Sequence, residues 1–203
     1  EQYARDHRFE YFHDGWTLHY NPNKVQAKGT IKNGVLSFQS GATYIENEAY
    51  KNNTSFHTLV IPESMKDLGY DTFDGCTNLK RIEYNAEYLE FGEQAFADCH
   101  NVEAIVLGPK VCHLPKEIFK DCSKVTSINF PASLRSIDSW AFLKTGIKDF
   151  ILPEGIENLE TGAIPAEYHS KVYFPSSLLK MENLGSFDRN TYYGCEQGTY
   201  AEK

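Results

Sequence analysis

The stretch that decides the fold is residues 118–137, IFKDCSKVTSINFPASLRSI, in which apolar residues recur between polar ones. Its first pair, Ile118-Phe119, has equivalents along the chain. These are Ala49-Tyr50, Thr72-Phe73, Ala95-Phe96, Ala141-Phe142, Ala163-Ile164 and Ser186-Phe187. The second members are 23 residues apart from Tyr50 to Phe142, and the last two steps are 22 and 23. A fixed period of this length is typical of proteins built by stacking one short unit.

An apolar triplet follows each of the first six pairs. The triplets are Leu59-Val60-Ile61, Ile82-Glu83-Tyr84, Ile105-Val106-Leu107, Ile128-Asn129-Phe130, Phe150-Ile151-Leu152 and Val172-Tyr173-Phe174. Their first and third members are always large and apolar, which predicts a short strand that turns those two side chains inward and the middle one outward. Proline follows four of the triplets directly, at positions 62, 131, 153 and 175, and ends the strand. Stacked coils would then form a parallel sheet.

The ends of the array differ from its repeats. Trp16, Leu18 and Tyr20 alternate with polar residues, and Asn33-Gly34 is a strong signal for a two-residue hairpin. We therefore predict an N-terminal antiparallel β cap at residues 1–41, a solenoid of about six 23-residue repeats at 42–187, and a C-terminal cap at 188–203. Each coil is too short to bury its own apolar face, so the ends of such an array must be covered.

Composition and charge exclude several classes of function. The chain has 20 Lys and Arg against 28 Asp and Glu, a net charge of −8, which opposes binding to nucleic acid. No apolar run approaches the roughly 18 to 20 residues that span a bilayer, so we expect no membrane insertion. The first residues, Glu1 to Asp6, lack the order of a signal peptide; if the protein is exported, we expect its leader to have been removed.

The repeat resembles the BspA-type leucine-rich repeat of bacterial cell-surface proteins, whose pattern residues 118–137 match almost position for position. The resemblance covers about residues 42–187. It departs at Asn85, where proline is usual, near Thr145, where one residue is missing, and at Ile164-Pro165. It implies an α/β repeat fold, a leucine-rich-repeat solenoid with one parallel β-sheet. It further implies an extracellular or cell-surface location, with protein binding or adhesion to a host or bacterial surface ligand, and no catalytic residues.

Three of the five cysteines occupy one repeat position. Cys76, Cys99 and Cys122 are 23 residues apart and should stack as a buried ladder. Packing is the favoured role because cysteine is small and usually buried, whereas zinc needs four converging ligands. A disulfide between two neighbours is the alternative. Cys99-His100 and Cys112-His113 flank one strand rather than share a face, so we predict no metal site.

No motif for catalysis or for a cofactor is present. The sequence contains neither a Gly-x-Ser-x-Gly elbow nor a Gly-rich phosphate loop, and a cysteine in an apolar ladder is a poor nucleophile. We therefore predict a protein that is not an enzyme and that needs no cofactor.

The candidate binding site is the outward face of the predicted sheet. The middle residues of the triplets are Val60, Glu83, Val106, Asn129, Ile151 and Tyr173, and four of these six are apolar or aromatic. Arg81 and Lys171 lie at flanking outward positions. One interpretation is that β-branched residues simply favour strands. The other is a surface that binds a protein partner, because contiguous exposed apolar area usually marks a contact. A structural spacer for another domain, or a glycan-active enzyme, is the alternative function.

Overall fold

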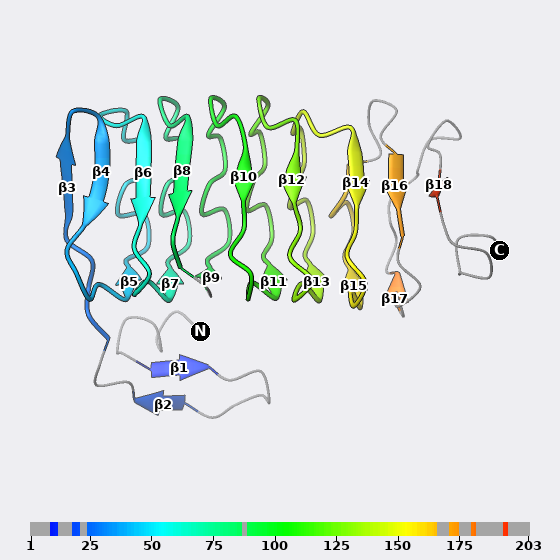
Figure 1. Ribbon diagram of the computed structural model, residues 1–203, viewed down its shortest axis with the longest axis horizontal. Helices are drawn as coiled ribbons and strands as arrows, with labels where there is room; N and C mark the ends of the chain where they lie inside the picture. Colours follow the sequence, from blue (N-terminus) through cyan, green and yellow to red (C-terminus); the bar gives the residue numbers. More distant parts are fainter. Residues whose placement is uncertain are drawn as a thin grey trace.

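The structure is a computed structural model of the 203-residue chain. It describes residues 24–86, 89–165 and 171–174, and in addition the backbone of four short strands at 9–11, 18–20, 180–181 and 193–194. Coils of chain are stacked side by side, and the strands of successive coils lie in a row (Figure 1). The repeat that the sequence predicts is therefore the stacking unit of a β-solenoid.

The first face of the solenoid carries the apolar triplets. Its parallel strands are β4 (Val35–Phe38), β6 (Thr58–Ile61), β8 (Arg81–Tyr84), β10 (Ile105–Val106), β12 (Ile128–Asn129), β14 (Asp149–Ile151), β16 (Lys171–Tyr173) and β18 (Tyr193–Gly194). They form three hydrogen-bonded groups, β4-β6-β8, β10-β12 and β14-β16-β18. Leu59 pairs with Ile82 and Ile105 with Ile128, so the register equals the repeat. The predicted triplet strands are confirmed.

A second face of short parallel strands was not predicted as a sheet. Its strands are β5 (Tyr44–Ile45), β7 (Asp67–Leu68), β9 (Glu90–Phe91), β11 (His113–Leu114), β13 (Ser136–Ile137), β15 (Asn158–Leu159) and β17 (Lys180–Met181). Each strand from β5 to β15 ends on a buried apolar residue. This single apolar position is the only feature of the strand that recurs in the sequence. The prediction of one parallel sheet is therefore wrong. The second face was missed because a strand of two residues is too short to show an alternating pattern in the sequence.

The third side of each coil, which we call the turn limb, leads from a second-face strand to the next first-face strand. No helix is found in the part of the chain that the structure describes, so the α half of the predicted α/β class is not found. Residues with positive φ interrupt the limb at two positions four residues apart. The first is Glu48, Asp71, Gln94, Glu117, Trp140 and Gly162; the second is Asn52, Gly75, Asp98, Asp121 and Lys144. A left-handed residue in every fourth position prevents continuous helical hydrogen bonding.

The turn limbs instead bond to one another. The Phe73 N–H donates to the Ala95 carbonyl at 2.9 Å, and the Phe96 N–H donates to the Ile118 carbonyl at 3.0 Å. Other limb N–H groups close turns within the coil, as from Cys76 to the Phe73 carbonyl at 3.1 Å. Backbone donors are thus satisfied without a helix, as buried amides require.

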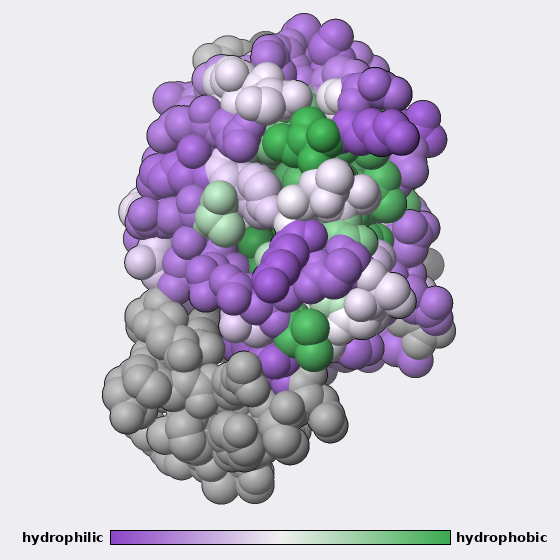
Figure 2. All heavy atoms as spheres, turned by 90° about the vertical axis from the view of Figure 1, so that its left-hand side faces the viewer, coloured by the Kyte–Doolittle hydropathy of each residue, from purple (hydrophilic) through white to green (hydrophobic). Residues whose placement is uncertain are grey.

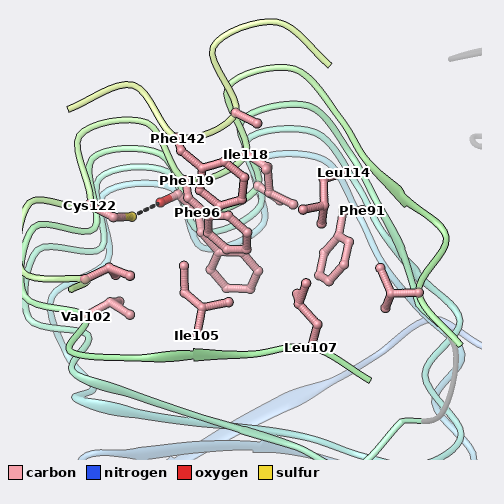
Figure 3. Packing of buried hydrophobic residues seen from close by; sticks show 14 of the residues in the cluster. Phe91, Phe96, Val102, Ile105, Leu107, Leu114, Ile118, Phe119, Cys122 and Phe142 are labelled. Atoms are coloured by element: carbon pink, nitrogen blue, oxygen red, sulfur yellow. Dashed lines mark hydrogen bonds between the residues drawn. The ribbon is translucent and has the colours of Figure 1, made fainter. Parts of the chain in front are cut away.

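A column of parallel aromatic rings forms the centre of the core (Figure 3). Ring centroids are 5.5 Å apart from Tyr50 to Phe73, 5.3 Å from Phe73 to Phe96, 5.9 Å from Phe96 to Phe119 and 5.7 Å from Phe119 to Phe142. The interplanar angles are 22° or less, and these distances lie in the range of favourable offset stacking. The 23-residue spacing of the aromatic residues therefore places one ring in each coil.

The cysteine ladder lies beside this column. Cys76, Cys99 and Cys122 are buried free thiols. The Cys122 Sγ donates to the Phe96 carbonyl of the preceding coil at 3.1 Å, and the other two thiols make the same bond to Tyr50 and Phe73 (Figure 3). The packing role that the sequence favours is thus observed, and each thiol also links two coils.

The N-terminal end of the described solenoid is an antiparallel hairpin. The strand β3 (Gly29–Lys32) pairs with β4 around the turn at Asn33-Gly34, and β4 continues in parallel to β6. The two-residue hairpin predicted there is present. A second antiparallel pair, β1 (Phe9–Tyr11) and β2 (Leu18–Tyr20), precedes it. The capping role of residues 1–41 stays a prediction, and the C-terminal cap at 188–203 lies outside the described residues except for β18.

Candidate functional site

The middle residues of the first-face strands form a single line, which we call the outer row: Val60, Glu83, Val106, Asn129, Ile151 and Tyr173. Val60 pairs with Glu83, Val106 with Asn129, and Ile151 with Tyr173 in the parallel register. Because adjacent strands are about 4.8 Å apart, the row presents one side chain roughly every 5 Å along the solenoid.

Exposure along the outer row rises toward its C-terminal half. Val60 and Glu83 are half-buried, whereas Val106 is 58% exposed, Ile151 69% and Tyr173 42%. Their strand neighbours point inward, since Ile105, Phe150 and Val172 are buried. Three large apolar side chains are therefore exposed to water, and none of them is needed to fill the core.

The polar members of the predicted site are less uniform. Arg81 is exposed, and its Nε lies 3.3 Å from Glu83 Oε1 in the same strand. Asn129 is exposed between Val106 and Ile151. Lys171 belongs to β16, but its side chain lies outside the described residues. The surface that results combines exposed apolar side chains with polar ones in the outer row and at its margins, and a mixed composition is common in protein interfaces.

Two exposed aromatic residues were not predicted from the sequence. Tyr70 and Trp140 lie on the turn limb, 37% and 41% exposed. The Lys116 ammonium is 5.5 Å from the centre of the Trp140 ring, close enough for a cation–π contact. Neither residue lies on the first face. The sequence pattern did not indicate them, because no other coil has the same residue type at the equivalent repeat position.

The thiols of the ladder are chemically inert. Burial raises the pKa of the Cys76 and Cys122 thiols to about 12, and it raises that of Cys99 as well. A thiolate is therefore not available near neutral pH, as expected for structural cysteines. Among the described residues no group of three or more His, Cys, Asp or Glu side chains is arranged to hold a metal ion.

One charged cluster links two neighbouring coils across the turn limb. The Gln94 amide donates to Glu117 Oε2 at 2.6 Å, and the Lys120 ammonium is 2.8 Å from the same oxygen. Burial would raise the pKa of Glu117, but the hydrogen bonds from Lys120 and Gln94 outweigh it, and the net shift is downward. These contacts join the turn limbs of two neighbouring coils.

The stacked coils, whose strand register equals the sequence repeat, define a repeat protein with a β-solenoid fold. A family model described as BspA type leucine rich repeat region matches residues 43–171 in six copies. The chain belongs to this family. No curated protein matches the sequence significantly. In the part of the chain that the structure describes, no helix is long and apolar enough to cross a membrane.

Solved structures with the same fold come from bacteria. A leucine-rich repeat protein from T. pallidum is 20% identical with a TM-score of 0.53, over 95% of this chain and 80% of that one. A leucine-rich repeat protein from Eubacterium ventriosum is 22% identical with a TM-score of 0.57, over 75% of this chain and 39% of that one. A leucine rich cell surface protein from Faecalibacterium prausnitzii is 18% identical with a TM-score of 0.49. That match covers 77% of this chain and 49% of the other, so this chain spans about half of its length.

Proposed function

We propose that this chain is a non-catalytic module that binds a protein at the outer surface of a bacterial cell or outside it. Membership of the BspA-type family supports the extracellular setting. The observation that carries the binding role is the outer row, in which Val106, Ile151 and Tyr173 are exposed on a rigid sheet face. Exposing apolar side chains to water is unfavourable, and these side chains do not contribute to the core. A partner that covers them therefore gains free energy from their burial.

The row also suits a shallow, elongated contact. The backbone that carries these side chains is already ordered in parallel strands, so little backbone entropy is lost on binding, which favours affinity. Tyrosine, the residue type at position 173, is among those enriched at the energetic centres of interfaces. We therefore place the main contact between β10 and β16.

The test compares proteins captured by the immobilised parent chain and by two variants, Ile151→Ala and Tyr173→Ala. Host and bacterial surface extracts are the sources, and bound proteins are identified by mass spectrometry. We expect at least one specific partner whose affinity falls roughly tenfold or more in each variant, about 1.4 kcal/mol. Stability should change little, because neither side chain fills the core.

Tyr70→Ala is the matched control, since it removes an equally exposed tyrosine from the turn limb. It should leave capture of the same partner unchanged. If Tyr70→Ala abolishes capture while both row variants bind like the parent, the contact lies on the turn limb. If the parent captures nothing specific, the chain acts as a structural spacer, and turnover of a glycan panel would instead indicate an enzyme.

A further inference from the structure

The strand β3 is an open edge of the first face. It is the outermost strand of its group, and all four of its residues, Gly29 to Lys32, are exposed. Asn33 and Gly34 have φ of 51° and 74°, as in a type I′ turn, in which the flanking residues Lys32 and Val35 form the first hydrogen-bonded pair. The alternation of antiparallel pairs then directs the N–H and C=O groups of Ile31 away from β4. An edge of this kind is a template for one more strand.

Side chains at this edge define what would fit there. Successive strand residues alternate sides, so Thr30 and Lys32 lie on one side of β3 and Ile31 on the other. An extended continuation of β3 would place Lys28, the residue before the strand, on the side of Lys32. Ile31 is 40% exposed and the nearby Val25 is 45% exposed. Viewed from this end, the middle of the molecule shows apolar side chains interrupted by hydrophilic ones, and hydrophilic surface lies around them (Figure 2).

The edge is basic although the chain as a whole is acidic. Residues 24–45 contain three lysines and neither Asp nor Glu, in a chain of net charge −8. Lys24 is buried and lies 3.4 Å from Asp67, which leaves the exposed Lys28 and Lys32 as the charges of the edge. Within residues 24–45 no acidic side chain complements these two lysines, and a partner can supply that charge.

We propose that β3 binds an extended acidic segment of a protein partner, which adds to the first face as a further strand. The Ile31 backbone supplies the hydrogen bonds, and the two lysines select acidic side chains four residues apart, about 14 Å in a strand. A second copy of β3 fits poorly in the antiparallel register that pairs Thr30 with its own equivalent, because Lys28 of one copy then lies opposite Lys32 of the other, and like charges there are destabilising.

The experiment uses the full chain and two capped pentapeptides. Acetyl-EVTVE-amide places two carboxylates on the side of the lysines, and acetyl-KVTVK-amide is its charge-reversed match. Binding is measured by fluorescence anisotropy of labelled peptides up to several mM. We expect EVTVE to bind at roughly millimolar strength or better and KVTVK at least tenfold more weakly, with added salt reducing the difference. Amide hydrogen exchange at Ile31 should be fast in the free chain and slow in the complex.

Two kinds of variant distinguish the contribution of backbone hydrogen bonds to binding from that of the lysine charges. Ile31→Pro removes the outward N–H, a change that edge strands tolerate, and should abolish binding of EVTVE. The double variant Lys28→Glu, Lys32→Glu leaves the backbone intact and should reverse the preference in favour of KVTVK. Lys66→Glu changes the net charge by half as much, away from the edge, and should bind like the parent.

Four results would overturn the proposal. The first is no saturable binding of EVTVE, and the second is equal binding of the two peptides. The third is slow exchange at Ile31 in the free chain, which would mean that another part of the chain covers the edge. The fourth is a dimer that Ile31→Pro dissociates, which would make the occupant a second copy. None of these results bears on the outer row, so this proposal and the proposed function fail independently.

Discussion

At the scale of single residues, Phe96 shows what one repeat position contributes. Its ring is buried and stacked between Phe73 at 5.3 Å and Phe119 at 5.9 Å. We expect Phe96→Ala to lower the free energy of unfolding by about 3 to 5 kcal/mol, because burial is lost and a cavity interrupts the ring column. Phe96→Leu fills most of that volume and should cost less. Chemical denaturation of both variants measures the difference, and equal losses would argue against the cavity.

The structural position of a residue was predictable wherever the same residue type recurs at one repeat position. The aromatic column and the buried cysteines follow directly from the 23-residue spacing. Val106 and Ile151 were placed outward by alternation alone. Trp140 was not predictable, because a bulky residue at positive φ is disfavoured locally and depends on its neighbours. Gly162 in the next coil provides the space, since a Cβ there would collide with the indole ring.

At the scale of elements, the turn limb is the part of the coil whose backbone conformation the sequence pattern does not predict. Residues 69–80 have a length and composition compatible with a helical turn. Whether they form one depends on φ at Asp71 and Gly75, both positive here. Polar residues such as Asp and Asn accept this conformation in many loops, so their presence does not distinguish a bent limb from a helix. The neighbouring coil decides, because it accepts the hydrogen bonds of the limb.

The second face holds a contact that makes stability depend on pH. His113 Nε2 lies 2.8 Å from Asp138 Oδ2 across two coils. Burial alone would lower the pKa of His113, but the hydrogen bond and the negative charges of Asp138, Glu160 and Glu90 outweigh it, and the net pKa is raised. The folded state therefore favours the protonated imidazole. Its contribution to stability is complete below the usual pKa of about 6.5 and is lost as pH rises through the higher folded value.

We therefore expect His113→Gln to cost more stability at pH 5.5 than at pH 8.5. Urea unfolding of the parent and the variant at both pH values measures the two differences. His100→Gln is the control, because the ring of His100 is bound to the carbonyl of Asp121 and is half-exposed. A loss for His113→Gln that is the same at both pH values would mean that the ion pair contributes nothing.

At the scale of the whole molecule, the solenoid behaves as a one-dimensional stack. Neighbouring coils contact one another through strand pairing along most of the two faces, hydrogen bonds between turn limbs, and stacked aromatic rings from Tyr50 to Phe142. Stability in such an array is close to a sum of coil and interface terms. The end strand β3 exposes its edge for the same reason, because a linear stack cannot close on itself.

The stack predicts that whole repeats can be removed but fractions cannot. Deleting residues 97–119 joins Phe96 to Lys120, removes 23 residues, and leaves the ring of Phe142 to stack on that of Phe96. We expect this variant to fold with a cooperative transition at a lower Tm, since one coil and one interface are lost. Deleting residues 97–108 removes about half a coil, so later strands would present the wrong side chains to the core, and this variant should not fold. Circular dichroism and thermal unfolding compare the two. If both deletions unfold alike, the coils are not independent units and the additive stack is wrong.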